Sequence, residues 1–466
     1  MNFMQTDIAI VGGGPAGYVA AITAAQKQKR VVLVEESSLG GTCLNKGCIP
    51  TKVLAGAGAL YALLKRSKEF GFDTGEPVIN WPRIQERKEE TVSTLRRGVE
   101  GLLRARKIEV IRGKGRLLGL GRISISAGSG TSALRADNII IASGSASASF
   151  PFAAVDEKDI LSSNGILELP ELPKSLAVIG GGVIGLEFAS IYSLLGVKVT
   201  VVELLSRILD GILDPEAAGM IARELQKRGV EIHTGARVDG IHHLESGKVR
   251  VSFAQSGGDR KITAEKVLIA AGRVPRTDGL GLDDAGVGLN GKAVKVNSRL
   301  ETGVPGIYAA GDVTGGYMLA HVASAEGATA ALNAVGIRKE MNYLSIPSCL
   351  YTCPEAAQVG LSEDEARKKY GKLKIGKFPL SASGKALIDG EVSGFVKIIS
   401  DPKYGEILGV TIVGGHATEL IAEAGLAISS EMTVEQIIET IHAHPTVAEA
   451  VREAALAAAG VPLHIL

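Results

Sequence analysis

A strand–turn–helix–strand pattern occurs twice in this chain. Residues 8–35 read IAIVGGGPAGYVAAITAAQKQKRVVLVE, and residues 176–203 read LAVIGGGVIGLEFASIYSLLGVKVTVVE, in the same register. Each copy runs from an apolar strand through a GxGxxG turn into a helix-length segment, a second apolar strand and a glutamate. This order predicts two dinucleotide-binding βαβ units, and with them an α/β fold with parallel sheets.

The three glycines of each turn are expected to have different physical roles. The first permits the tight turn, the second lets a pyrophosphate approach the backbone, and the third lets the helix pack against the strand. The phosphates would lie at a helix N-terminus, where free N–H groups and the helix dipole favour negative charge. The predicted site residues are Gly12, Gly14, Gly17 and Glu35 in the first copy and Gly180, Gly182, Gly185 and Glu203 in the second.

Two dinucleotide sites in one chain imply two dinucleotides. Because hydride passes readily between a flavin and a nicotinamide, the first copy is expected to hold FAD and the second to hold NAD. The glutamates Glu35 and Glu203 would accept hydrogen bonds from ribose hydroxyl groups. Glu203 also favours NAD over NADP, because its carboxylate would repel a 2′-phosphate and only Arg207 follows it as a nearby basic group.

Two cysteines follow the first unit, Cys43 and Cys48 in the segment GGTCLNKGCIPTK. On a regular helix, Cα atoms five residues apart are separated by roughly 8.6 Å, which exceeds the limit of about 7 Å for a disulfide. A helix must therefore begin or distort between them, and Gly47 and Pro50 fit such a break. Metal ligands and idle core thiols are the alternatives, but no nearby His/Cys pair completes a tetrahedral metal site. The position beside a dinucleotide site favours a redox-active pair.

Residues 40–52 resemble the redox-active segment of the pyridine nucleotide–disulfide oxidoreductases, and further motifs of that family follow in order along residues 6–455. The resemblance implies that Cys43 is the thiol that meets substrate and that Cys48 lies against the flavin. It also implies that Lys52 lies near the flavin and pairs with Glu187. The other implied contacts are Gly115, Asp312 and Ala320 for FAD, with Asp312 on the ribityl chain, and Gly272 for NAD.

A histidine–glutamate pair lies near the C-terminus. Pro445 is suited to open the helix that follows His444, and Glu449 can reach back to one ring nitrogen, which would orient the histidine and raise its basicity. In the family this base comes from the neighbouring subunit, so the resemblance implies an obligate homodimer. His442 is interpreted as an ordinary satisfied histidine. No role is predicted for Cys349 and Cys353, which are expected in a strand.

The expected architecture is two Rossmann-like dinucleotide-binding domains, for FAD and NAD, with a C-terminal α+β dimerisation domain. The predicted segments are 1–145 and 272–345 for the FAD domain, 146–271 for the NAD domain and 346–466 for the dimerisation domain.

Within the family, three features favour a member that reoxidises protein-bound dihydrolipoamide with NAD. Ile184 occupies the position of a tyrosine in glutathione-reducing members, Glu203 disfavours NADP, and the tail VPLHIL lacks the cysteine pair of mercury-reducing members. Such a protein serves 2-oxo acid dehydrogenase or glycine cleavage complexes, with a lipoyl-bearing domain as substrate and a peripheral-subunit-binding domain of an acyltransferase core as a docking partner. The alternatives are another NAD(P)H-dependent flavin disulfide reductase, similar to glutathione reductase, and a chiefly structural subunit.

Charge and hydropathy exclude several other classes. The net charge is +1 with both signs interspersed, so the sequence has no concentration of positive charge that would bind nucleic acid. The charged runs 83–90 and 96–106 are expected to form the solvated face of a long amphipathic helix. No signal peptide and no uncharged stretch of 18 apolar residues is expected, and no metal site is predicted. A cytoplasmic enzyme is the resulting expectation.

Overall fold

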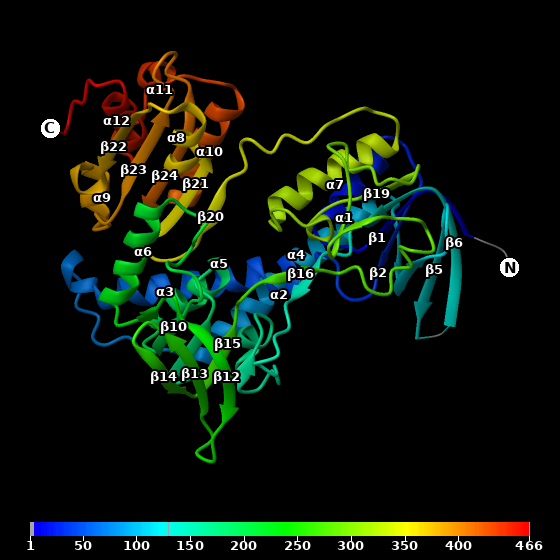
Figure 1. The fold of residues 1–466 in the computed structure, drawn as a ribbon, viewed down its shortest axis with the longest axis horizontal. Coiled ribbons are helices and arrows are strands. Elements are labelled where there is room, and N and C mark those ends of the chain that lie inside the picture. The colour runs from blue at the N-terminus through cyan, green and yellow to red at the C-terminus, as the bar shows by residue number, and fades with distance from the viewer. Residues whose placement is uncertain (1–3, 129, 466) are drawn as a thin grey trace. The chain divides into compact units, whose positions relative to one another are not determined.

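The computed structural model describes residues 4–128 and 130–465 and divides into two compact units (Figure 1). The first unit comprises Met1–Val53, Pro82–Ser149 and Gly272–Met341, and the second comprises Leu54–Trp81, Phe150–Ala271 and Asn342–Leu466.

The first unit is built on a seven-stranded sheet in the order β3-β2-β1-β6-β5-β4, with β19 paired to β6. The strands β1, β2, β3, β6 and β19 pair in parallel, whereas β4 and β5 form an antiparallel extension. Their bounds are β1 Met4–Val11, β2 Val31–Glu35, β3 Glu109–Arg112, β4 Lys114–Leu117, β5 Arg122–Ala127, β6 Gly130–Ile141 and β19 Ile307–Ala309. Two short strand pairs complete it: β7 Ser145–Ser147 with β16 Arg273–Pro275, and the hairpin of β17 Leu289–Asn290 with β18 Ala293–Val294.

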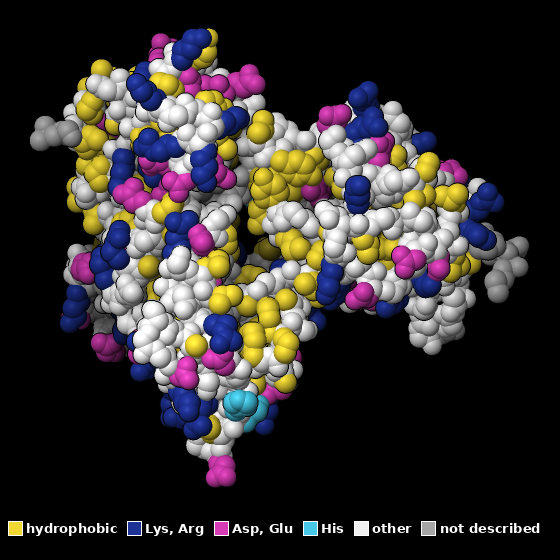
Figure 2. Space-filling view, in the orientation of Figure 1, with side chains coloured by type: hydrophobic (Ala, Val, Ile, Leu, Met, Phe, Trp, Pro, Cys, Tyr) yellow, Lys and Arg dark blue, Asp and Glu magenta, His cyan; other side chains and the backbone are white. Residues whose placement is uncertain are grey.

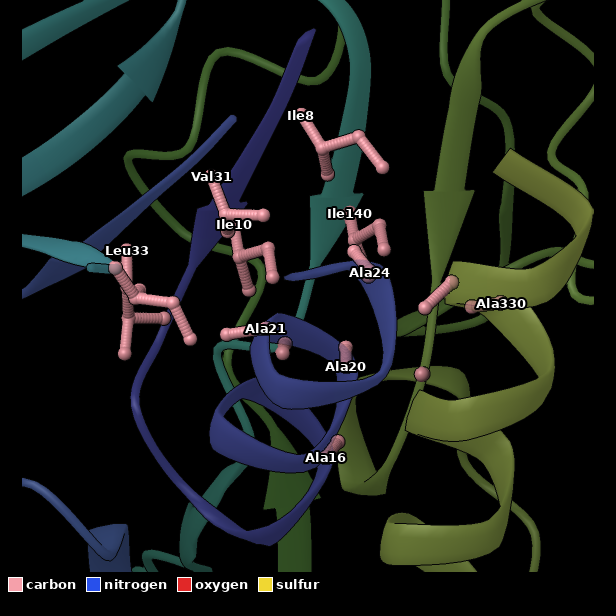
Figure 3. Close-up of a cluster of buried hydrophobic side chains, with 14 of the residues drawn as sticks. Ile8, Ile10, Ala16, Ala20, Ala21, Ala24, Val31, Leu33, Ile140 and Ala330 are labelled. Atoms are coloured by element: carbon pink, nitrogen blue, oxygen red, sulfur yellow. The ribbon is translucent and has the colours of Figure 1, made fainter. Parts of the chain in front are cut away.

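Helix α1 (Pro15–Gln26) packs closely against α7 (Ala320–Ala334) in this unit. A methyl group on Gly327 would collide with the carbonyl group of Ala16. Figure 3 shows alanines of α1 between the sheet residues Ile10 and Ile140 and Ala330 of α7. Small side chains along both helices therefore set the close approach that holds α1 against the sheet.

Helix α4 (Trp81–Ala105) confirms the expected long amphipathic helix, with one exception. Arg83 is exposed and pairs with Glu86 and Glu90, but Lys88 is only 1% exposed. Lys88 shares a helix face with the buried Val92, since residues four apart lie on one side of a helix. The prediction that the whole charged run is solvated is therefore wrong at Lys88.

The nucleotide-binding part of the second unit repeats the architecture with a five-stranded parallel sheet, β11-β10-β9-β15-β8. A three-stranded antiparallel sheet, β12-β13-β14, packs with it. The bounds are β8 Ile160–Leu161, β9 Ser175–Ile179, α5 Val183–Leu194, β10 Lys198–Val202, α6 Pro215–Lys227, β11 Glu231–His233, β12 Arg237–His243, β13 Val249–Gln255, β14 Gly258–Ala264 and β15 Lys266–Ile269.

The C-terminal part of the second unit is a five-stranded antiparallel sheet, β20-β21-β24-β23-β22, packed against helices α10 and α12. The bounds are β20 Ser348–Leu350, β21 Glu355–Gly360, α8 Glu363–Tyr370, β22 Lys374–Pro379, α9 Gly384–Asp389, β23 Phe395–Ser400, β24 Ile407–Gly414, α10 Ala417–Ser429, α11 Val434–Glu439 and α12 Glu449–Ala458. The expected fold class, two Rossmann-like parts and an α+β C-terminal part, is confirmed. Helix α12 begins at Glu449, so the prediction that Pro445 opens it is wrong.

One helical run within the described residues, Gly41–Lys65, is long and apolar enough to cross a membrane by length and composition. Of an apolar 18-residue window within it, 28% is buried. The run consists of α2 (Gly41–Lys46) and α3 (Cys48–Lys65), which Gly47 separates. A single run of this kind is weak evidence for a membrane span, because core helices pass the same test. The run carries Lys46, Lys52 and Lys65, so it is not an uncharged apolar stretch of the kind considered in the sequence.

Charged side chains of both signs are interspersed over the face in Figure 2. This distribution agrees with the net charge of +1.

Candidate active site

The first glycine turn, Gly12–Gly17, joins β1 to α1. Its first glycine has φ 107°, which favours glycine, and a methyl group there would collide with the carbonyl of Ala142. A methyl group on Gly17 would collide with the carbonyl of Gly12, so this glycine lets α1 start against the strand. Both roles match those predicted from the motif.

The second turn repeats this geometry at the start of α5. Gly180 has φ 112° and approaches the carbonyl of Ala270, while Gly185 approaches the carbonyl of Gly180. Hydrogen bonds recur as well: Gly12 N–H donates to Val34 O over 2.8 Å, and Gly180 N–H donates to the corresponding Val202 O over 2.9 Å. The two sequence copies are therefore two copies of one structure.

The middle glycines leave room that packing within the protein does not require. Gly14 and Gly182 have φ of −73° and −81°, which any residue can adopt. A methyl group on Gly14 would meet nothing closer than 3.7 Å, and one on Gly182 would meet no described atom within 4 Å. Neither backbone strain nor a neighbouring atom accounts for these glycines. The open space fits a ligand that approaches the backbone, as a dinucleotide pyrophosphate does.

The helix ends beside this space suit an anion. Helices α1 and α5 begin directly after Gly14 and Gly182, and no described side chain caps either N-terminus. The first N–H groups of a helix lack partners within the helix, so they remain available to phosphate oxygens. The residues present therefore fit two dinucleotides.

The two glutamates have the same hydrogen-bond pattern. Glu35 accepts the Gly13 N–H over 2.6 Å and the Ser37 N–H over 2.7 Å. Glu203 accepts the N–H groups of Gly181 and Leu205 over 2.5 and 2.7 Å. In each glutamate the Oε2 atom, which accepts the glycine N–H, retains a lone pair for a further donor, such as a ribose hydroxyl.

Arg207, the basic residue that closely follows Glu203 in the sequence, is paired with Asp210. A guanidinium nitrogen of Arg207 lies 2.5 Å from Oδ1 of Asp210. The Glu203 carboxylate would thus repel a 2′-phosphate, and Arg207 would have no unpaired charge to offset that repulsion. This pairing supports the preference for NAD.

The cysteines lie on two separate helices. Cys43 belongs to α2 and Cys48 is the first residue of α3, with Gly47 between them in a non-helical conformation (φ −149°, ψ −109°). The predicted helix break is therefore confirmed at Gly47. Pro50 lies in the first turn of α3, where proline is tolerated, which agrees with a helix that starts at Cys48.

The two sulfur groups interact with each other and with nearby cations. The hydrogen bond between the Cys43 and Cys48 side chains raises the pKa of the Cys43 thiol, burial raises it further, and the charge of Lys52 opposes both. Burial lowers the pKa of Arg273, while the charges of Asp312 and Cys48 oppose that shift. Lys52 and Arg273 therefore both lie within electrostatic reach of the cysteine pair.

Asp312 is held by a network that the sequence did not reveal. Ser145, in β7, is buried and its hydroxyl bonds to a carboxylate oxygen of Asp312. Arg273, in β16, donates from Nε to the same hydroxyl over 2.8 Å. These residues meet only because β7 and β16 pair, so no local pattern could have shown the contact.

Glu187 is 4% exposed and lies on α5. Its carboxylate accepts the backbone N–H of Tyr351 over 3.1 Å. The expected pairing of Glu187 with Lys52 joins residues of different units, and it stays a prediction.

The predicted pair near the C-terminus is formed. Nδ1 of His444 lies 3.0 Å from Oε1 of Glu449, and the backbone N–H of Thr446 donates to Oε2 over 2.9 Å. Partial burial raises the pKa of Glu449, but the hydrogen bonds from Thr446 and His444 outweigh it and the net pKa is lowered. His444 is 80% exposed, so its other ring nitrogen is accessible from solvent.

The residues expected to be ordinary are placed as follows. His442 is largely buried and bonds to Glu423 and to the carbonyl of Thr440, which confirms a satisfied histidine. Cys349 lies in β20 as expected, but Cys353 lies beyond its end. Cys353 is tied instead by its N–H to Ser190 and by its carbonyl to Arg228.

Three further predicted cofactor contacts have clear positions. Gly115 lies in β4, where a methyl group would press on Val11. Ala320 is the first residue of α7, and Gly272 precedes β16 with φ 136°. Their roles toward FAD and NAD stay predictions.

The chain belongs to the pyridine nucleotide–disulphide oxidoreductase family. The family model matches residues 6–327, and the model of its dimerisation domain matches residues 346–455, which supports the expected homodimer.

Full-length relatives carry one particular name. The chain is 41% identical over 460 residues to a dihydrolipoyl dehydrogenase of Bacillus subtilis (strain 168), covering 98% of this chain and 99% of the relative. It is 43% identical over 461 residues to the dihydrolipoyl dehydrogenase of Chlamydia pneumoniae, covering 99% and 98%.

Solved structures agree in fold. LpdA from Mycobacterium tuberculosis is 31% identical with a TM-score of 0.89, covering 97% of this chain and 99% of that one. The flavoprotein disulfide reductase RclA from Escherichia coli, in a Cu(II) complex, is 28% identical with a TM-score of 0.88, covering 98% and 99%.

Proposed function

We propose that this protein is a dihydrolipoyl dehydrogenase, which oxidises dihydrolipoamide to lipoamide with FAD as its bound cofactor and NAD as the hydride acceptor. The observation that carries the proposal is the Cys43–Cys48 pair at the break between α2 and α3, beside a dinucleotide turn and within reach of Lys52 and Arg273. Full-length relatives at 41% and 43% identity bear that name.

The exchange chemistry starts with a proton transfer. His444 of the partner subunit accepts a proton from one thiol of dihydrolipoamide, and Glu449 orients that histidine through its other ring nitrogen. The resulting thiolate attacks Cys43, the Cys43–Cys48 disulfide breaks, and Cys48 leaves as a thiolate. The second substrate thiol then attacks the mixed disulfide and loses its proton to solvent, so lipoamide forms its ring and Cys43 leaves with the electron pair. Two substrate thiols are oxidised and two enzyme sulfurs are reduced.

The cations around the pair stabilise the charge that this exchange creates. Lys52 and Arg273 both act on the sulfur groups, and a positive environment lowers the energy of a thiolate. Glu187, buried on α5, is proposed as the carboxylate partner of Lys52, since a buried carboxylate needs a cation to offset its desolvation.

The glycine turns and their glutamates are proposed to hold the cofactors. The residues around Gly12, Gly14, Gly17 and Glu35, with Asp312, would bind FAD, and those around Gly180, Gly182, Gly185 and Glu203 would bind NAD. Bound FAD would carry the two electrons from the enzyme dithiol to NAD. Gly115 and Ala320 are proposed as further FAD contacts and Gly272 as a further NAD contact.

The proposed partners follow from the substrate. A lipoyl-bearing protein domain would deliver dihydrolipoamide, and a peripheral-subunit-binding domain of an acyltransferase core would dock the homodimer. A cytoplasmic location goes with this proposal.

An anaerobic titration tests the activity. Dihydrolipoamide is added to the purified holoenzyme while visible absorbance is followed, and NAD is added afterwards. A long-wavelength band that grows with dihydrolipoamide and disappears with NAD is the expected result. A flavin spectrum that does not respond to dihydrolipoamide would refute the substrate, and turnover of NADPH with glutathione disulfide would then indicate the alternative reductase.

Two variants locate the chemistry. Cys43→Ser should abolish lipoamide turnover while FAD stays bound. Cys349→Ser, a matched change in β20, should retain turnover. Retained turnover in Cys43→Ser would contradict the exchange scheme.

A further inference from the structure

Tyr18 carries a hydroxyl group that the fold does not use. The residue follows the third glycine of the first turn, on α1, and its partly buried ring packs against the core cluster of the FAD part. Within the described residues its hydroxyl forms no hydrogen bond. A tyrosine hydroxyl next to an apolar core usually finds a polar partner, and a group whose charge changes during the reaction is a candidate for that partner.

The start of α2 lies directly against the start of α1. Gly40 N–H donates to the Gly13 carbonyl over 2.8 Å, and a methyl group on Gly41 would lie 2.6 Å from Cα of Gly14. Cys43 follows Gly41 by two residues on α2, and Tyr18 lies one turn after Gly14 on α1, since its N–H donates to the Gly14 carbonyl over 3.0 Å. Burial raises the pKa of Tyr18, and the nearby Cys43 sulfur raises it further, so the phenol remains a proton donor at neutral pH.

The second copy of the repeat shows that packing does not require this hydroxyl. Leu186 occupies the register position of Tyr18, directly after the third glycine, and it is fully buried. An apolar side chain therefore suffices for the βαβ unit. The tyrosine appears in the copy that is followed by the cysteine pair.

We propose that the Tyr18 hydroxyl donates a hydrogen bond to the Cys43 sulfur when that sulfur is a thiolate. The inference rests on the proposed function, in which Cys43 leaves the mixed disulfide with the electron pair as the substrate's second sulfur closes the ring. A charge-assisted hydrogen bond to the departing sulfur stabilises the thiolate. A leaving thiol with a lower pKa leaves faster.

Alkylation of the reduced holoenzyme tests this contact without lipoamide or NAD. The enzyme is reduced with dithionite and treated with iodoacetamide over a pH series. Trypsin cleaves at Lys46, between the two cysteines, so the two alkylated peptides are measured separately. In Tyr18→Phe we expect Cys43 to react about tenfold more slowly below its pKa, with its pH midpoint raised by about one unit.

The matched control is Tyr308→Phe. Tyr308 belongs to the same core cluster, and its hydroxyl donates to the carbonyl of Asn333 over 3.3 Å. This variant should keep the wild-type pH midpoint of Cys43. Tyr18→Leu, which installs the side chain of the second copy, should reproduce the shift of Tyr18→Phe and keeps the test valid if one variant folds poorly.

An unchanged pH midpoint of Cys43 in both Tyr18 variants would overturn the inference. Failure of the proposed function would give a different result, namely wild-type enzyme whose cysteines are reduced by dithionite but not by dihydrolipoamide. A single-turnover reaction with dihydrolipoamide provides a second readout, in which Tyr18→Phe should release lipoamide more slowly than Tyr308→Phe.

Discussion

Nδ1 of His444 lies 3.0 Å from Oε1 of Glu449 at the start of α12. One turn further along the same helix, Glu453 holds a second histidine, because its Oε1 lies 2.9 Å from Nδ1 of His464. The two pairs have the same chemistry and both histidines are exposed, at 80% and 70%. Only the His444–Glu449 pair matches the motif of the family. The His464–Glu453 pair therefore serves as a control for variants of His444.

His444→Gln should lower lipoamide turnover by about 10²- to 10⁴-fold, because it removes a general base. The dimer should persist, since the side chain is exposed. Steady-state kinetics and size-exclusion chromatography measure the two properties. His464→Gln should keep most of the activity, and equal losses in the two variants would reassign the base.

Glu449→Gln should reduce stability in a pH-dependent way. The folded-state pKa of Glu449 lies below its ordinary value of 4.5, so the carboxylate stabilises the fold above pH 4.5. This contribution is lost as the pH falls through the lower folded-state pKa. Denaturant unfolding at pH 7 and pH 3.5 should therefore show a difference between variant and wild type that shrinks at the lower pH. A constant difference would contradict the prediction.

Gly182→Ala should weaken NAD binding with little change in stability, whereas Gly185→Ala should reduce stability. A methyl group on Gly182 meets no described atom within 4 Å, so the free energy of unfolding should change by at most about 0.5 kcal/mol. The KM for NAD should rise about tenfold or more, because the methyl group would occupy the space proposed for the pyrophosphate.

In Gly185→Ala the methyl group would collide with the Gly180 carbonyl, so a loss of about 2 kcal/mol or more in stability is expected. Thermal unfolding and NADH titration separate the two effects. Unchanged NAD kinetics in a stable Gly182→Ala enzyme would exclude the proposed position of the pyrophosphate.

Lys397→Met should destabilise the second unit by about 3 kcal/mol, because it leaves a buried carboxylate without its cation. Nζ of Lys397, on β23, lies 2.7 Å from Asp214, and the side chains are 4% and 1% exposed. The carboxylate of Asp214 also accepts the N–H of Glu216 at the start of α6. Urea unfolding of the holoenzyme measures the loss.

Lys68→Met is the control for that measurement. Lys68 and Asp73 form an exposed pair at 3.8 Å, with side chains 80% and 85% exposed. The expected change in the free energy of unfolding is within about 0.5 kcal/mol. Similar losses of unfolding free energy in both variants would show that burial of the Lys397–Asp214 pair adds nothing to its contribution to stability.

Two predictions that came from local patterns were confirmed. The turns at Gly12 and Gly180 need only a few consecutive residues, so spacing alone identified them and their repeat. The break at Gly47 followed from the distance that a regular helix imposes between Cys43 and Cys48. The start of α12 was missed, because proline at position 445 permits a helix start but does not require one.

The sequence by itself determined the two βαβ units, the interrupted helix with its cysteines and the His444–Glu449 pair, because each depends on residues close together in the chain. Only the tertiary structure decided that Ser145 and Arg273 hold Asp312, that Lys88 is buried and that the start of α2 lies against the start of α1. These relationships depend on which strands pair and which helix faces turn inward. That outcome is set by packing across the whole chain, and no short segment encodes it.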